Sequence, residues 1–141
     1  LGVGISLTDL PGALEEIDRW IARRDPGFVC VRDVHGVVRA QEEPDLARAH
    51  EQARMVVADG MPLVKLVRWA GHPGIGRVRG ADLFRETCRR SVAAGHGHFL
   101  YGGAEGTAER LAETLRRDFP GIRIVGARCP PFRPLTAAEE E

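Results

Sequence analysis

The fold of this chain follows from one stretch, Arg54-Met55-Val56-Val57-Ala58-Asp59-Gly60-Met61-Pro62. Its four consecutive apolar residues, 55–58, are typical of a strand that is buried on both faces. The acid and the glycine end this strand, and the proline suits the first turn of a helix. A carboxylate between a parallel strand and the next helix lies at the sheet edge where open α/β folds bind ligands. Asp59 is therefore the first candidate for a functional side chain.

Outward from this stretch, predicted strands and helices alternate along the chain. Short apolar runs predict strands, and apolar residues that recur every three or four positions predict helices. The predicted strands are 1–6, 28–31 with an extension to 36, 55–58, 98–101 and 122–125. The predicted helices are 10–21, 44–53, 61–70, 81–94 and 107–118. This order predicts a Rossmann-like α/β fold, in which a mostly parallel sheet has helices on both faces and residues 1–141 form a single domain.

The composition disfavours several classes of protein. The 20 basic and 20 acidic residues balance to a net charge of zero, which argues against broad electrostatic binding of nucleic acid. The three cysteines are odd in number and include no CxxC pair, so neither a disulfide framework nor a zinc site is expected and a reducing compartment fits. No apolar run reaches the roughly 18 residues of a membrane-spanning helix.

Asp59 has two interpretations on local grounds. As the residue before a helix, it can cap that helix by accepting hydrogen bonds from its free N–H groups. As an ionised carboxylate stabilised near a helix N-terminus, it can accept a proton from an attacking hydroxyl group. The two roles can coexist, and this stretch alone leaves both open.

Two further stretches contain groups that suit a diphosphate. The turn Gly102-Gly103-Ala104-Glu105-Gly106 precedes a helix, and its glycines would let backbone amides approach a phosphate at the helix N-terminus. A plain turn is the alternative, and the spacing departs from the GxGxxG dinucleotide motif. In Arg77-Val78-Arg79-Gly80-Ala81-Asp82, either arginine could neutralise a leaving diphosphate, or could be a solvated surface residue.

The histidines do not predict a metal site. Asp33 and His35 are two residues apart and share a face if the strand extends through them, and His96 and His98 do the same. Either pair could bind a metal, but no third ligand is spaced to join it. The two remaining histidines are predicted to lie on the surface: His50 and His72.

Taken together, these stretches resemble the WecG/TagA/CpsF family of bacterial glycosyltransferases. The combination of blocks is specific, and it extends over nearly all 141 residues. In order, the blocks are LGVGIS (1–6), FVCVRDVHG (28–36), ADGMPLV (58–64), RVRGADLF (77–84), HFLYGGAEGTAERL (98–111), FPGIRIVG (119–126) and PPFRPLT (130–136).

The resemblance implies a function that composition does not. Family members transfer a sugar, commonly N-acetylmannosamine, from a UDP-sugar donor to undecaprenyl-diphosphate-linked N-acetylglucosamine. The reaction inverts the anomeric centre and is expected to need no metal or other cofactor. Its products are teichoic acid linkage units, enterobacterial common antigen or capsular polysaccharide. The resemblance therefore predicts a cytoplasmic enzyme at the inner face of the plasma membrane.

The resemblance also assigns roles to residues. Asp59 matches the family's proposed base, and Arg77 matches an arginine near the diphosphate. The other predicted substrate-binding residues are Asp33, His35, Gly60, Gly80, Asp82, Gly102 and Gly103. Since the Asp59, Arg77–Asp82 and glycine-turn groups lie at strand ends or in loops before helices, they can converge on one edge of the sheet.

This chain departs from the family in two places. Val31-Arg32-Asp33 replaces a Thr-x-Asn motif, which puts a charge where relatives have an amide and could alter sugar or acceptor preference. Relatives also continue past the PPFRPLT block with another βα unit and a basic tail associated with membrane docking. The chain is therefore expected to be truncated at its C-terminus, which would remove the membrane contact and expose apolar surface that favours a homo-oligomer. An inactive fragment and a non-catalytic nucleotide-binding module remain the alternatives.

Overall fold

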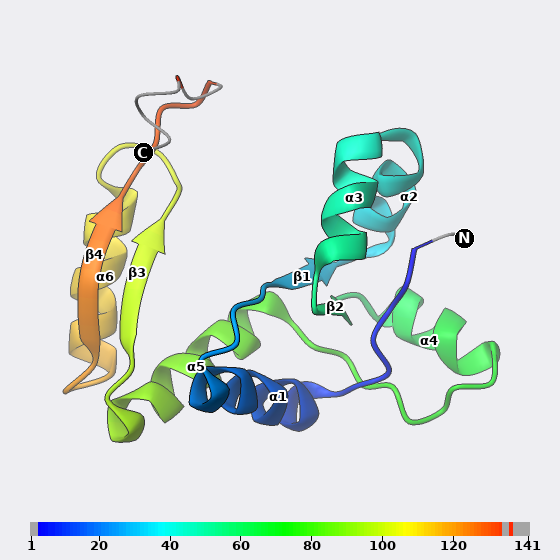
Figure 1. Cartoon of the computed structure of the whole chain (residues 1–141), viewed down its shortest axis with the longest axis horizontal. Helices are drawn as coiled ribbons and strands as arrows, with labels where there is room; N and C mark the ends of the chain where they lie inside the picture. Colours follow the sequence, from blue (N-terminus) through cyan, green and yellow to red (C-terminus); the bar gives the residue numbers. More distant parts are fainter. Residues whose placement is uncertain (1–2, 134–135, 137–141) are drawn as a thin grey trace. The chain divides into compact units, whose positions relative to one another are not determined.

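The computed structural model of the chain describes residues 3–133 and residue 136. The chain divides into two compact units, Leu1–Arg85 and Glu86–Glu141, and each is described by itself. Figure 1 shows the order of helices and strands along the chain. The boundary between the units falls within one helix, α5 (Gly80–Ala94). The prediction of a single domain stays a prediction.

The first unit contains a pair of parallel strands and the helices that follow them. β1 (Val29–Arg32) pairs with β2 (Met55–Ala58), with Val29 opposite Met55. The helices are α1 (Leu10–Arg23), α2 (Val34–Glu42), α3 (Pro44–Gln52), α4 (Met61–Trp69) and the start of α5.

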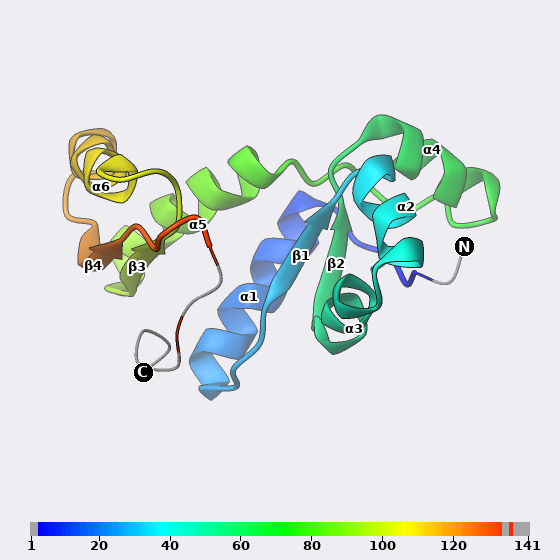
Figure 2. The same cartoon turned by 90° about the horizontal axis from the view of Figure 1, so that it is seen from above.

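Helices cover both faces of this strand pair (Figure 2). On one face, Met55 and Val57 of β2 pack with α1 in one hydrophobic cluster. On the other face, Ala58 packs with Val64 of α4 and Val37 of α2 in a second cluster. The alternation of side chains along a strand explains why four apolar residues in a row are needed: each face of β2 has its own core.

The second unit contains another parallel pair. β3 (Gly97–Tyr101) pairs with β4 (Arg123–Arg128), and α6 (Thr107–Asp118) connects them. Ala108, Ala112 and Leu115 of α6 form a cluster with Leu100 of β3. Phe99 and Val125 are exposed, at 59% and 60% of their surface, because alternate residues of these strands lie outside that cluster.

The α/β class with parallel strand pairs is confirmed, and the helices predicted from periodicity are present. The described strands form two parallel pairs, β1–β2 and β3–β4, which is consistent with the predicted Rossmann-like α/β fold. The first predicted strand is wrong. Residues 3–6 are not a strand, although the Ser6 amide donates to the Val56 carbonyl at 2.8 Å. The Ser6 hydroxyl accepts from the Val56 amide at 3.0 Å, so a side chain occupies the donor that a strand ladder would use.

The extension of the second strand to residue 36 is also wrong. β1 ends at Arg32 because Asp33 caps α2, a helix that was not predicted. The Asp33 Oδ1 accepts a hydrogen bond from the Gly36 amide at 2.8 Å. Asp33 and His35 therefore do not share a strand face.

Helices in the described part of the chain are too short or too polar to cross a lipid bilayer.

Candidate active site

Asp59 lies directly after β2, at the end of the strand pair where β1 also ends. Its amide donates to the Arg32 carbonyl at 2.8 Å, which joins the ends of the two strands. Its side chain is 37% exposed, so the carboxylate is accessible to a ligand while its backbone is fixed. This agrees with the predicted position at the carboxyl end of parallel strands.

The Asp59 carboxylate is held by residues that follow α4. Its Oδ2 accepts from the Gly80 amide at 3.4 Å, and its Oδ1 lies 3.5 Å from Nη2 of Arg77. The Arg77 Nε also donates to the Asp59 backbone carbonyl. Arg77 thus contacts both the backbone and the side chain of Asp59, and this bridge restricts the orientation of the carboxylate.

Of the two interpretations of Asp59, the one in which it caps the helix after it is wrong. Gly60 is the N-cap residue of α4, and no side chain caps that helix. The Asp59 carboxylate lies instead at the first residue of α5, Gly80, where the positive end of that helix dipole favours an anion. The helix that stabilises the carboxylate begins about 20 residues later in the sequence, so local pattern could not identify it.

The segment 76–80 is tied to the strand end at several points. The Val78 amide donates to the Ala58 carbonyl at 2.8 Å, and the Gly76 amide donates to the Thr8 carbonyl at 3.0 Å. Val78 is fully buried in the first hydrophobic cluster. The arginine and the glycine that contact Asp59 are therefore placed by backbone hydrogen bonds and by packing.

The structure brings most of the predicted residues of the first unit together. A Cβ built on Gly60 would lie 3.8 Å from the Cβ of Asp33, so these residues are neighbours at the two strand ends. Asp82 lies in the first turn of α5, with its Oδ2 3.9 Å from Nη1 of Arg79. His35 is exposed in the first turn of α2.

The glycine turn belongs to the second unit. Gly102 and Gly103 have φ values of 120° and 83°, which residues with a side chain rarely adopt. The turn lines a cavity of about 1030 Å³ together with Cys129 and Arg133. That this cavity and the Asp59 site converge on one substrate stays a prediction.

Part of the α6 N-terminus already has protein partners. The Thr107 amide donates to the Ala104 carbonyl at 2.9 Å, and the Ala108 amide donates to Sγ of Cys129 at 3.3 Å. A diphosphate could use these two amides only by displacing those partners. The proposed phosphate contact at this turn therefore stays a prediction, and Cys129 is a contact that sequence inspection missed.

Metal binding finds no support in the described residues. Within residues 3–133 and 136, no three His, Cys, Asp or Glu side chains are grouped closely enough to hold an ion. The Nε2 of His98 lies 2.5 Å from Oγ of Ser91. Burial, and secondarily His96, lowers the pKa of His98. The expectation of a metal-free reaction stays a prediction.

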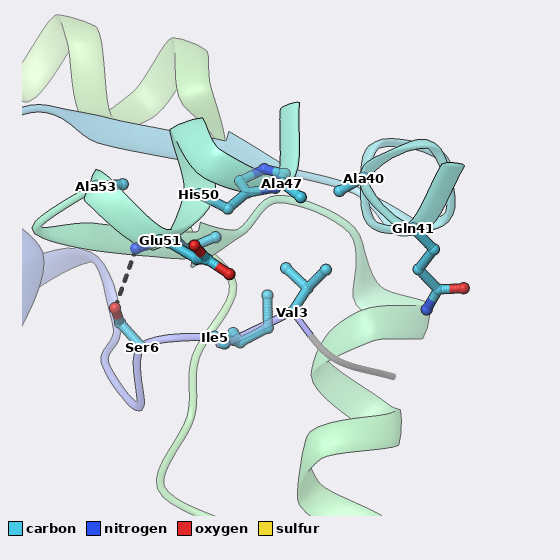
Figure 3. A pocket seen from close by; sticks show the side chains of 11 residues that line it. Val3, Ile5, Ser6, Ala40, Gln41, Ala47, His50, Glu51 and Ala53 are labelled. Atoms are coloured by element: carbon cyan, nitrogen blue, oxygen red, sulfur yellow. Dashed lines mark hydrogen bonds between the residues drawn. The ribbon is translucent and has the colours of Figure 1, made fainter. Parts of the chain in front are cut away.

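His50 is buried, so its predicted surface position is wrong. Only 6% of its surface is exposed, and Arg32 Nε donates to its Nε2. His50 lines a cavity of about 500 Å³ with residues of α2 and the N-terminal segment (Figure 3). None of the predicted site residues lines this cavity. A donated hydrogen bond at Nε2 requires the neutral ring with its proton on Nδ1, which has no partner in the described part of the chain.

This burial predicts a pH-dependent stability. Desolvation, and secondarily the Arg32 guanidinium, lowers the pKa of His50 below its ordinary value. As the pH falls through about 6.5, the unfolded chain binds a proton that folded His50 resists. The free energy of unfolding should therefore be highest above about pH 7 and should fall toward about pH 5.5.

Denaturant titrations across this pH range measure the effect. His50→Gln retains an acceptor for Arg32 and cannot titrate, so its pH slope should be shallower. His98→Gln in the second unit is the comparison for His50→Gln. Burial also lowers the pKa of His98, so this variant measures the part of the pH slope that His98 causes. An unchanged slope in His50→Gln would show that His50 does not cause the dependence.

A mixed α/β chain with a carboxylate fixed at the carboxyl ends of parallel strands has the arrangement that open α/β proteins use to bind ligands at that edge. The family model of the Glycosyl transferase WecG/TagA/CpsF family matches residues 1–141, and the chain belongs to this family.

One relative is the N-acetylglucosaminyldiphosphoundecaprenol N-acetyl-beta-D-mannosaminyltransferase of Bacillus spizizenii, which is 30% identical over 87 residues. The matched segment covers 62% of this chain and 34% of that relative. The chain thus matches about a third of the relative's length.

Proposed function

We propose that the protein is an inverting glycosyltransferase of bacterial cell-surface polysaccharide synthesis. It moves N-acetylmannosamine or a related hexose from a UDP-sugar to undecaprenyl-diphosphate-linked N-acetylglucosamine. Membership in the family and the activity for which the Bacillus relative is named support this proposal. The observation that carries it is the accessible Asp59 carboxylate, held at the ends of β1 and β2 by Arg77 and Gly80.

Asp59 acts as the general base. Its carboxylate accepts the proton of an acceptor hydroxyl while the hydroxyl oxygen forms a bond to the anomeric carbon of the donor. The bond from that carbon to the β-phosphate oxygen breaks, and its electron pair leaves with UDP. Attack from the face opposite UDP inverts the anomeric centre. The Arg77 bridge contributes by keeping the carboxylate oriented toward the acceptor, since misplaced catalytic groups lose much of their effect.

In a metal-free reaction, a protein cation would have to balance the negative charge that develops on the departing UDP. Arg77 is half exposed, and its contact with Asp59 Oδ1 is a loose 3.5 Å. Its guanidinium has several donors, so it can contact a phosphate oxygen and the Asp59 carbonyl together. The glycine turn, with Gly102 and Gly103, is the second proposed diphosphate contact. The Gly102 amide donates to the Arg128 carbonyl at 3.0 Å, so a diphosphate would have to displace that partner to use it. Asp33 is proposed to contact the sugar or acceptor, since it lies beside Gly60.

The proposed location is the cytoplasmic side of the plasma membrane, where a UDP-sugar in solution can meet a lipid-linked acceptor. Association with the membrane through the family's C-terminal segment and assembly into a homo-oligomer belong to this proposal. No cofactor is proposed.

Release of UDP tests the proposed reaction. The full gene product is mixed with a lipid-diphosphate-linked N-acetylglucosamine analogue and a series of UDP-sugars, with UDP-N-acetylmannosamine expected to react fastest. Turnover should persist after treatment with EDTA. Calorimetry with UDP and NAD provides the comparison with a non-catalytic nucleotide-binding module: binding of NAD without UDP, and no release from any donor, would contradict the transferase.

A further inference from the structure

The helix that follows the candidate base has an exposed apolar side. Leu63 and Val64 of α4 are buried in the second hydrophobic cluster, whereas Leu66 is 41% exposed and Trp69 is 87% exposed. Pro62, Leu66 and Trp69 are spaced by four and three residues, which places them along one side of the helix. Packing within this unit does not explain why a tryptophan and a leucine on one side of a helix are exposed to water, and such apolar patches often bind a partner.

This apolar side continues into a groove of about 440 Å³. Leu66, Trp69 and Ala70 of the α4 end line it on one side, and Leu7 of the N-terminal segment lines it on the other. Leu7 is itself 57% exposed. The described residues that line the groove include no acidic side chain. These residues and the neighbouring lysine define the α4 face: Leu7, Lys65, Leu66 and Trp69. Within the described part of the chain, its centre is apolar and has no acidic side chain.

The charged side chains of α4 itself are both basic, Lys65 and Arg68. The next two cations along the chain, Arg77 and Arg79, pair with Asp59 and Asp82 and do not contribute to this face. Lys65 is exposed on α4 beside the apolar stripe. Arg68 donates hydrogen bonds of 3.0 and 2.8 Å to the Ile75 carbonyl, which hold its charge at the C-terminal end of α4.

We propose that the α4 face docks on an anionic lipid bilayer. A short amphipathic helix with a tryptophan and flanking cations is suited to the interface of such a membrane, where the ring enters the headgroup region and the cations meet lipid phosphates. A second copy of the chain fits less well, because two such faces would bring cations together. The proposal rests on the proposed function for its purpose: Asp59 lies two residues before α4, so docking would bring the base to the plane of a lipid-linked acceptor.

Vesicle co-sedimentation of the full chain tests this face without any sugar substrate. Vesicles of phosphatidylcholine with phosphatidylglycerol should bind the chain, and vesicles of phosphatidylcholine alone should bind it weakly. Trp69→Ser should lower the partition coefficient at least about tenfold, and Lys65→Gln should lower it about fivefold. Val125→Ser, which removes an exposed apolar residue of the second unit, should bind as the unchanged chain does.

Tryptophan fluorescence gives a second measurement. The chain has two tryptophans, and Trp20 is already buried at 9% exposure, so a blue shift on vesicle binding should come from Trp69 and vanish in Trp69→Ser. Equal binding to both lipids, or binding unchanged in Trp69→Ser, would overturn the proposal. A dimer that Trp69→Ser dissociates, without vesicle binding, would assign the face to a second copy instead and also overturn it. Asp59→Asn should bind vesicles as the unchanged chain does, because Asp59 lies outside the α4 face. Vesicle binding by the unchanged protein without transfer from any sugar donor would contradict only the proposed function.

Discussion

Asp59→Asn is expected to lower kcat of the full gene product by about 10²- to 10⁴-fold, with little change in KM for the sugar donor. The amide has nearly the same shape and can still accept from the Gly80 amide, so the strand-end geometry is retained. It cannot accept the acceptor's proton, and the attacking oxygen loses its base. Steady-state UDP release over a range of donor and acceptor concentrations measures the loss.

Asp45→Asn is a suitable control for this variant. Asp45 is an exposed residue of α3 that pairs only at the surface with Arg48, so its replacement should leave turnover unchanged. Thermal unfolding of both variants should match that of the unchanged protein to within a few degrees. Full turnover in a folded Asp59→Asn variant would remove Asp59 from its role as base.

Arg77→Gln is expected to lower kcat/KM by about 10²- to 10³-fold. The guanidinium contacts the Asp59 carbonyl and lies 3.5 Å from its carboxylate, so its loss would free the base and remove a cation from the site. The effect on stability should be small, about 1 kcal/mol or less, because the ion pair is partly exposed. UDP release and denaturant titration of the same sample separate these two effects.

Calorimetry with UDP then distinguishes two roles for Arg77. If it neutralises the diphosphate, Arg77→Gln should weaken UDP binding as well as turnover. If it only positions Asp59, UDP binding should be unchanged while kcat falls. Arg48→Gln, an exposed arginine of α3, is the matched control. Unchanged kcat and UDP binding in Arg77→Gln would exclude both roles.

Most helices and the strand β2 could be predicted from the sequence because the patterns that indicate them are local. The run at 55–58 coincides with β2, and helical periodicity identified α1, α3, α4, α5 and α6 to within a few residues. The position of Asp59 at the strand end followed from this pattern. Proximity between Asp59 and Arg77 was suggested by the family resemblance, whereas their contact distances required the structure.

The features that the sequence did not predict depend on contacts between distant residues, or on two local structures that the same residues can form. Asp33 could continue a strand or cap a helix, and the Gly36 amide decides for the cap. His50 is polar and lies in a polar helix, so nothing in its neighbourhood indicated burial beside Arg32. The division into two strand pairs depends on hydrogen bonds between strands, which periodicity does not specify.

The attachment of segment 76–80 to the end of β2 has a consequence for the divergence of related enzymes. The chain leaves the strand end after Asp59, forms α4, and returns to the same place through the Val78–Ala58 and Gly80–Asp59 hydrogen bonds. Because both ends of this excursion are fixed, substitutions on the exposed side of α4 need not move the carboxylate. Natural variation can therefore change the surface that α4 presents while the position of Asp59 at the strand end is retained.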